Sequence, residues 1–403
     1  MLYLPNSKIA ERTIDMTKKL YYSTPRTHEW ETTITSVKET EGHFYITLAE
    51  TAFYPEGGGQ PSDHGTINGM DVLELSIVND EVVHKLASAP SSEVVSCTLD
   101  WSRRFDHMQQ HSGQHLLSAV CRELFDAQTL SFHLGQDYVT IDIALTDLTD
   151  SQVLAIENKA NQYIYENRKI TTYFVTNQQL QELPVVKPPK VSENIRIVEM
   201  EGIEYNPCGG THVERTGEIG LLKIIKTEKQ KSQTRIYFLS GLRTLADYTE
   251  SSKILNHLTA HFNTHRSELV NRVEKLDHDV KNQAKEIEQL KREAAIHEAA
   301  TLLSSTENGL LSKVFDNKSM KELQVLAHSI LAEEPVLVLF ATTVENKVYL
   351  THNGTNSLDC GQFFKEQLPL FNGRGGGSSK AAQAGFTNEQ LLKFFEFAKQ
   401  QLH

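Results

Sequence analysis

The stretch His111-Ser-Gly-Gln-His115 places two imidazoles four residues apart in a segment with helical periodicity. At that spacing both rings project from one face of a helix, about one turn apart, which suits two ligands of one metal ion. A second pair with the same spacing, Cys208-Gly-Gly-Thr-His212, contains two glycines that let the backbone fold tightly. Imidazole and thiolate donors together are typical of zinc (Zn²⁺) sites. The sequence therefore predicts one metal site formed by His111, His115, Cys208 and His212.

A third histidine, His107, lies one turn before His111 on the same stripe of the expected helix. It could replace Cys208 or His212 as a ligand, it could contact a ligand residue without binding the metal, or it could be exposed. The second and third alternatives are favoured. Four protein ligands would fill a tetrahedral zinc ion, and closed sites of this kind are usually structural. The sequence thus predicts zinc binding more directly than zinc-activated hydrolysis.

The residues before this helix predict a β-rich part over 1–97. Segments such as Thr32–Val37 and His43–Leu48 are dense in β-branched and aromatic residues. Glycine, proline and asparagine separate them, as in Pro55-Glu-Gly-Gly-Gly59. A small barrel or curled sheet is expected here.

The rest of the chain predicts an overall α+β fold with three further parts. Helical and strand patterns alternate over 98–247, where Asp150 is expected to cap a helix. A long helical, coiled-coil-like segment follows over 248–305. The remainder, 306–403, is expected to be an α/β module with a buried strand at 335–341 and a glycine-rich loop at 372–379. Within the long segment, a heptad seam predicts a coiled-coil hairpin or a dimer helix: Leu269, Val273, Leu276, Val280, Gln283, Ile287, Leu290 and Ala294.

Composition limits the class of protein. The chain has 403 residues and a net charge of −12, with four widely spaced cysteines. That spacing favours reduced thiols in a cytoplasmic protein over a disulfide framework. The start, Met1–Pro5, does not resemble a signal peptide, and no apolar run approaches the roughly 20 residues of a membrane span. The acidic total argues mildly against nucleic-acid binding, except at one local concentration of positive charge. Its members are Lys223, Lys226, Lys229, Lys231 and Arg235.

Together, the paired ligand motifs and further motifs resemble the long form of the alanyl-tRNA editing family. Its members are free-standing proteins similar to the editing and C-terminal parts of alanyl-tRNA synthetase. Motifs carry the resemblance in the same order along nearly the whole chain. They are Thr51-Ala-Phe-Tyr-Pro-Glu-Gly-Gly-Gly-Gln-Pro-Ser-Asp63, His111-Ser-Gly-Gln-His-Leu-Leu117, Cys208-Gly-Gly-Thr-His212 with Arg215-Thr-Gly217, and Gly373-Arg-Gly-Gly-Gly377 with Ala382-Gln-Ala-Gly385.

The resemblance implies an editing domain with a zinc site over 98–247 and a tRNA-binding module at the C-terminus. His111, His115, Cys208 and His212 match the family's ligands, whereas His107 does not. The implied activity is hydrolysis of the ester that joins serine or glycine to mischarged tRNA(Ala). Gln114 and His133 are candidates for contacting the substrate, although each could be structural. Gln114 stands where the synthetase often has a small hydroxyl residue, so the choice of amino acid is left open.

Several residues are candidates for contacting tRNA. The turn Gly57, Gly58, Gly59 and Gln60 could present backbone N–H groups to a phosphate or ribose, or could be only a tight β-turn. The basic run Lys223 to Arg235 could meet the acceptor stem, or could be a solvated strand or turn. Arg374 and Lys380 could meet the tRNA body. The long helix or the C-terminal module is expected to form a homodimer.

Two rival functions remain. One is a zinc-stabilised tRNA-binding or dimerisation module without catalytic activity. The other is a metal-dependent hydrolase of small aminoacyl or amide substrates, which the basic run and the separate C-terminal module disfavour. The chain contains no Asp-His-His triplet, so the chemistry of the DHH phosphoesterases is not expected. It also lacks any segment resembling the aminoacylation domain of the synthetase, so use of ATP is not expected.

Overall fold

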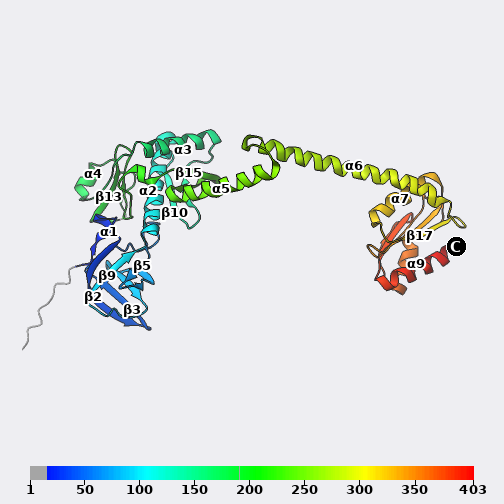
Figure 1. Cartoon of the computed structure of the whole chain (residues 1–403), viewed down its shortest axis with the longest axis horizontal. Coiled ribbons are helices and arrows are strands. Elements are labelled where there is room, and N and C mark those ends of the chain that lie inside the picture. Colours follow the sequence, from blue (N-terminus) through cyan, green and yellow to red (C-terminus); the bar gives the residue numbers. More distant parts are fainter. Residues whose placement is uncertain (1–15, 190) are drawn as a thin grey trace, which may run out of the picture. The chain divides into compact units, whose positions relative to one another are not determined.

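The computed structural model describes residues 16–189 and 191–403, so the stretch Met1–Pro5 lies outside the described residues. The chain divides into two compact units, Met1–Asn256 and His257–His403, each with its own core (Figure 1). The boundary between the two units falls within a helix. The limits of the four expected domains stay predictions. In the described residues, no helix is both long and apolar enough to cross a membrane.

The first unit begins with a β-rich part that forms a curled sheet. The sheet runs in the order β6-β5-β9-β2-β3-β8-β7 and encloses a core that includes Ile46, Phe53 and Val82. The mixed fold with a curled sheet is confirmed, whereas closure of the sheet into a barrel is not, because β6 and β7 lie at its edges. The elements are β1 Lys18–Lys19, α1 Leu20–Ser23, β2 Glu29–Thr40, β3 His43–Leu48, β4 Glu50–Thr51, β5 Gly65–Ile67, β6 Met70–Asp71, β7 Glu74–Val78, β8 Glu81–Leu86 and β9 Val94–Leu99.

The helix α2 (Trp101–Phe125) leads from this sheet into the second half of the unit, and its side chains from Met108 to Cys121 are buried (Figure 1). Two antiparallel sheets, β10-β11-β16-β15 and β12-β13-β14, pack with α2 and α3 around the central core. The N-cap of α3 is Thr149 rather than the expected Asp150, because Thr149 forms a capping box with Gln152. The elements are β10 Thr129–Leu134, β11 Val139–Ile143, α3 Asp150–Tyr165, β12 Ile170–Val175, α4 Asn177–Gln181, β13 Ile195–Met200, β14 Glu204–Pro207, η1 Thr216–Ile219, β15 Leu222–Gln230, β16 Gln233–Ser240 and α5 Gly241–Phe262.

The second unit is an α/β module whose sheet has the order β17-β18-β19-β21-β20. The parallel pair β17 and β18 lies beside antiparallel β19, and the buried strand expected at 335–341 is β18. The expected glycine-rich loop was wrong in part, because residues 374–377 pair with β21 as the edge strand β20. The elements are η2 Arg266–Glu268, α6 Leu269–Leu303, β17 Leu310–Phe315, α7 Met320–Glu333, β18 Leu337–Thr342, β19 Lys347–Thr351, α8 Cys360–Gln367, η3 Leu368–Phe371, β20 Arg374–Gly377, β21 Ala381–Gly385 and α9 Asn388–Leu402.

The long helical segment is divided rather than continuous. The helix α5 ends at Phe262, and Asn263 then takes a positive φ of 46°, which starts the turn before α6. The heptad seam begins at the first residue of α6. Much of the seam is exposed, with Val273, Leu276 and Ile287 about half exposed. Pairing of this seam into a coiled coil stays a prediction.

A buried ion pair ties the β-rich part to the start of α2. Arg104 is fully buried, and its guanidinium donates to both carboxylate oxygens of Asp63 and to the backbone carbonyls of Pro25 and Ala52. Asp63 also accepts from the backbone N–H of Tyr54. Removing one member of such a pair leaves the other charge buried without compensation.

We therefore expect Asp63→Ala to lower the free energy of unfolding by about 3–5 kcal/mol. Urea denaturation followed by tryptophan fluorescence measures this, because both tryptophans, Trp30 and Trp101, lie next to this core. The matched control is Glu74→Ala, which removes an exposed ion pair to Lys85 and should cost less than about 1 kcal/mol. Equal losses in the two variants would contradict the role of the buried pair.

Candidate metal centre

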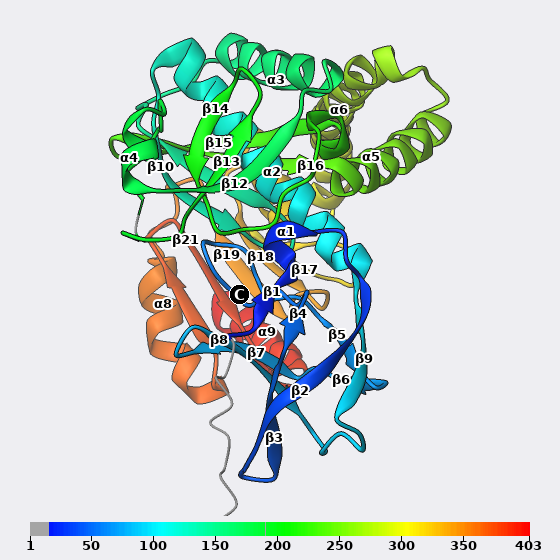
Figure 2. The ribbon, with the colours of Figure 1, turned by 90° about the vertical axis from the view of Figure 1, so that its left-hand side faces the viewer.

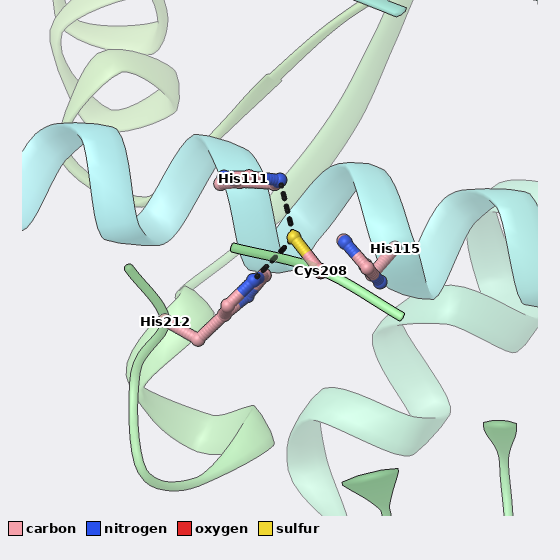
Figure 3. Close-up of side chains that lie close together, drawn as sticks. All are labelled: His111, His115, Cys208 and His212. Atoms are coloured by element: carbon pink, nitrogen blue, oxygen red, sulfur yellow. Dashed lines mark hydrogen bonds between the residues drawn. The ribbon is translucent and has the colours of Figure 1, made fainter. Parts of the chain in front are cut away.

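The helix α2 supplies two of the four side chains that converge in the first unit. His111 and His115 lie one turn apart on its buried face, with ring centroids 5.2 Å apart. The side chain of Asp100 caps the helix by accepting from the backbone N–H of Arg103. Figure 3 shows both rings directed to the same side of α2.

The loop after β14 supplies Cys208 and His212. Arg196 on β13 fixes this loop, because its Nη1 donates to the carbonyls of Cys208 and Gly210, each at 2.8 Å. Gly210 has no room for a side chain, since a Cβ there would lie 2.2 Å from Cε1 of His111. The Cys-x₃-His loop can therefore press against α2 only with glycine at this position.

The four donor atoms have the spacing of a tetrahedral site. One ligand atom from each of His111, His115, Cys208 and His212 lies within 4.8 Å of all the others (Figure 3). The Cys208 Sγ atom is 3.4 Å from Nε2 of His111 and 3.4 Å from Nε2 of His212. Ordinary zinc–sulfur and zinc–nitrogen bonds at tetrahedral angles would separate these atoms by about 3.6 Å.

Each histidine of the cluster is oriented by a hydrogen bond at its Nδ1 atom, the ring nitrogen that does not face Cys208. The Nδ1 atoms contact Gln60 Oε1 at 2.9 Å for His111, Glu204 Oε1 at 2.9 Å for His115, and Ser112 Oγ at 3.1 Å for His212. When each Nδ1 carries the proton and donates it, each Nε2 keeps a free lone pair. Such contacts orient metal-binding histidines in proteins, so these residues fit a zinc ion.

The thiol of Cys208 is prepared for metal binding. Burial alone would raise its pKa, but when Nε2 of His111 or His212 carries a proton, the charge of that ring and its hydrogen bond to Sγ hold the pKa of Cys208 well below its ordinary value. Burial raises the pKa of Cys121 and Cys97 to about 12 each. Because the thiolate is the metal-binding form, Cys208 differs in kind from these buried cysteines.

His107 is not part of the cluster, and of its two favoured placements, in contact with a ligand residue or exposed to solvent, the exposed one was wrong. Its ring is buried, and its Nδ1 atom has no hydrogen-bond partner in the described residues. Burial and the positive charge of Arg103 lower its pKa to about 4, so the ring is neutral. In the described part of the chain, the cluster of possible metal ligands contains the other two histidines of α2 and leaves His107 out.

The two candidates for contacting the substrate lie on different elements, Gln114 on α2 and His133 on β10. Gln114 lies on α2 beside His115, and its Nε2 donates to Ser118 Oγ at 2.8 Å. No hydrogen bond within the described residues engages its Oε1. On β10, Phe132 stacks on the ring of His111, with centroids 5.4 Å apart. Since neighbouring side chains alternate between the faces of a strand, His133 points away from the metal centre.

The turn Gly57–Gln60 is a tight turn that also braces the metal centre. The backbone groups of Gly57 and Gln60 bond to each other in both directions, at 3.1 and 3.0 Å. Gly58 and Gly59 have positive φ angles of 59° and 87°, which favour glycine. A Cβ on Gly59 would lie 2.9 Å from the ring of Phe132. The fully buried Gln60 side chain bonds to His111, to Thr211 Oγ1 at 2.8 Å and to Thr211 N at 3.0 Å.

The basic run lies on the hairpin β15-β16, where carboxylates from elsewhere in the chain partly neutralise it. Lys223 pairs with Glu157, Lys229 with Asp147, and Arg235 with Asp142, while Lys226 pairs with its neighbour Glu228. Lys231 lies in the hairpin turn with a positive φ of 49° and is exposed. The lysine pairs have an exposed ammonium group and can exchange, whereas Arg235 donates two hydrogen bonds to the buried Asp142, so a contact of this run with tRNA stays a prediction.

In the second unit, Arg374 is the first residue of the edge strand β20 and is exposed. Lys380 lies between β20 and β21, and its Nζ would be 3.2 Å from a Cβ built on Gly354. Both cations therefore lie close to the glycine-rich strand β20, because Arg374 begins it and Lys380 follows its last residue by three positions. A role for either in binding tRNA stays a prediction.

The fold and the cluster define an editing-type domain whose four side chains could hold a metal ion, joined to a C-terminal α/β module. The model of the threonyl and alanyl tRNA synthetase second additional domain matches residues 195–237, and that of the DHHA1 domain matches residues 306–403. The chain is 36% identical over 313 residues to the alanyl-tRNA editing protein Aarsd1-B of Xenopus laevis, covering 75% of each chain. The chain belongs to the alanyl-tRNA editing protein family.

Two further relatives extend the match along the chain. The alanyl-tRNA editing protein AlaX-L of Pyrococcus horikoshii is 28% identical over 405 residues, covering 96% of this chain and 98% of the relative. An alanine–tRNA ligase of Methanobrevibacter smithii is 29% identical over 392 residues, covering 91% of this chain but only 44% of the ligase. The similarity therefore spans both units.

Sequence reasoning missed the side chains that orient the ligands. Gln60 was predicted as a backbone contact for tRNA, yet its side chain is buried against His111. Glu204 and Phe132 received no role at all. The Gly57–Gln60 motif was noticed, but nothing local indicates that its last side chain reaches a helix 51 residues away.

We expect Gln60→Ala to weaken zinc binding by about 10- to 100-fold, because His111 loses the acceptor that orients its ring. Competition with a chromophoric chelator measures the affinity. The matched control is Gln178→Ala, which changes an exposed glutamine on α4 and should leave zinc affinity unaltered. Equal zinc affinity in the Gln60→Ala variant and the unchanged protein would contradict this positioning role.

Proposed function

We propose that this chain edits tRNA(Ala) in trans, by hydrolysing the ester that joins serine, or glycine, to the 3′ end of the mischarged tRNA. The observation that carries the proposal is the convergence of His111, His115, Cys208 and His212, each histidine being held through Nδ1. Membership of the alanyl-tRNA editing protein family supports the substrate. The similarity to an alanine–tRNA ligase also supports tRNA(Ala) as the RNA.

Zinc is the metal that suits one thiolate and three imidazoles, and it would supply positive charge near the ester. Four protein donors leave no vacant position in a tetrahedral site. The chain's own residues therefore act mainly by positioning the aminoacyl end of the tRNA, whose ester is already reactive.

Gln114 is the residue that we place against the aminoacyl group. Its amide is held by Ser118, which in turn accepts a hydrogen bond from Thr129 Oγ1 at 2.7 Å. With Nε2 fixed in this way, Oε1 is the atom free to accept from the amino group of the substrate. The small hydroxyl residue common at this position in the synthetase would leave more room, so Gln114 would influence which amino acid is accepted.

The tRNA contacts that we propose are spread over both units. In the turn Gly57–Gln60, the backbone N–H groups of Gly58 and Gly59 donate to no carbonyl within the described residues and would bind a phosphate or ribose. Lys231 and its neighbours on the hairpin β15-β16 would meet the acceptor stem. Arg374 and Lys380 would meet the body of the tRNA, and the exposed seam of α6 would join two copies of the chain.

A second candidate function is supported by one observation, the closed set of four ligands. A site without a vacancy is usual for structural zinc, which would make this chain a tRNA-binding module without turnover. The same side chains would then stabilise the fold and nothing more. Only a measurement of turnover distinguishes this candidate from the editing enzyme.

We expect Cys208→Ala to release zinc and to lower the rate of Ser-tRNA(Ala) hydrolysis by at least about 100-fold, because removing a residue that merely orients a ligand already costs about 10- to 100-fold. Zinc content and release of labelled serine measure the two effects. The matched control is Cys360→Ala in the second unit, which removes a buried thiol outside the cluster and should retain both zinc and activity. Full activity of Cys208→Ala in chelator would contradict the proposal.

The proposed contact at β20 has a separate test. We expect the double variant Arg374→Ala, Lys380→Ala to weaken tRNA binding equally for charged and uncharged tRNA. The slope of log K against log salt should fall by up to about 2, because each cation that neutralises a phosphate contributes about 1 to it. Filter binding at several salt concentrations measures this. An unchanged slope would mean that neither cation touches a phosphate.

A further inference from the structure

An aromatic pair beside the metal-binding loop has no role in the site described above. Phe174 on β12 is 53% exposed. Its ring meets the ring of Tyr22 edge to face, with centroids 5.8 Å apart and an angle of 81°. Single exposed apolar residues are common on protein surfaces, so the surroundings decide whether this one has a function.

The surroundings connect Phe174 to the metal centre. Phe174 lies directly opposite Arg196 on β13, so their side chains share one face of the sheet. The Arg196 guanidinium lies 5.1 Å from the centroid of the Tyr22 ring and holds the carbonyls of Cys208 and Gly210. The N–H of Cys208 donates to the carbonyl of Arg196 at 3.1 Å. Phe174 and Cys208 therefore lie on opposite sides of Arg196, each one interstrand spacing away, so their backbones are roughly 10 Å apart.

The rest of this sheet is covered on both faces. On the face of Phe174, Val198 and Met200 belong to the central core. On the other face, Val175 and Ile197 pack with Leu180 of α4. Figure 2 shows β12, β13 and β14 side by side in this part of the molecule. The exposure of Phe174 is thus confined to the corner next to the metal-binding loop.

A buried positive charge lies beneath this corner. Arg196 is 6% exposed, and in the described part of the chain no carboxylate forms an ion pair with it. Its partners are backbone carbonyls and the face of Tyr22. Exposed aromatic rings bind single-stranded nucleic acid because every base can stack on them, and the buried Arg196 fixes the Tyr22 ring against which Phe174 packs.

We propose that Phe174, held edge to face by Tyr22, is a stacking platform for the unpaired nucleotides that precede the terminal adenosine of the RNA substrate. This rests on the proposed function, in which the aminoacyl ester lies at the metal centre. The strand attached to that ester must leave the centre along one side, and the platform offers bases a surface within roughly 10 Å of Cys208. Arg196 acts as a positioning residue that joins the platform to the metal-binding loop.

The test compares a long and a short substrate. We expect Phe174→Ala to raise KM for Ser-tRNA(Ala) between about 5-fold and 150-fold, the range measured when one stacked base loses its aromatic partner. The kcat value and the zinc content stay the same, because Phe174 touches neither the metal ligands nor the ester. For 3′-O-seryl-adenosine, which lacks the preceding nucleotides, kcat/KM stays the same. Phe174→Trp restores KM for Ser-tRNA(Ala).

The matched control is Tyr165→Ala, which removes a 79% exposed ring from α3 and should change neither substrate's kinetics. An unchanged KM for Ser-tRNA(Ala) in Phe174→Ala would overturn the platform while leaving the editing function standing. An equal loss with seryl-adenosine would also overturn it, because Phe174 would then act on the metal centre.

If the unchanged protein hydrolyses neither substrate, the proposed function fails and the platform is decided separately. Fluorescence anisotropy with a labelled single-stranded oligoribonucleotide ending in CCA measures binding without turnover. The platform predicts weaker binding by Phe174→Ala than by Tyr165→Ala. Equal affinity of these two variants would overturn the platform.

Discussion

The structure of the first unit depends on keeping three imidazole Nε2 atoms directed at one thiolate. The helix α2 fixes the spacing of His111 and His115, and Gly210 lets the Cys208 loop approach that helix. The partners of the three Nδ1 atoms come from separate segments: the turn of Gln60 in the β-rich part, Ser112 on α2 itself, and Glu204 on β14. One cluster therefore joins the β-rich part, α2 and the sheet β12-β13-β14, and a metal ion would reinforce contacts that these residues already make.

The features that could be predicted from the sequence are those that depend on residues close together in the chain. Two pairs of ligands at four-residue spacing, the β-rich start and the buried strand β18 all follow from periodicity and composition. Prediction from the sequence failed where partners come from far along the chain. The run Lys223 to Arg235 carries one acidic residue in sequence, yet in space Glu157, Asp147 and Asp142 lie against it. The same limit hid the buried side chain of Gln60 and the stacking of Phe132 on His111.

The chemistry of the site follows from the number of donors. With a metal bound, a full set of four ligands would favour placing the aminoacyl end over generating a nucleophile, and an activated ester needs little more than placement and water. Specificity for the tRNA must then come from surfaces away from the cluster. The aromatic corner at Phe174 would hold the single strand next to the ester, and the cations near β20 would hold the duplex. These two kinds of contact differ in their dependence on salt, since stacking is largely insensitive to it and phosphate contacts are not.

The central claim is that His111, His115, Cys208 and His212 bind one zinc ion together. X-ray absorption at the zinc edge, on the full chain loaded with one equivalent of zinc, tests it most directly. The account predicts one sulfur at about 2.3 Å and three nitrogens at about 2.0–2.1 Å. A shell without sulfur, or with more than one sulfur per zinc, would contradict it, because Cys208 is the one cysteine of the cluster.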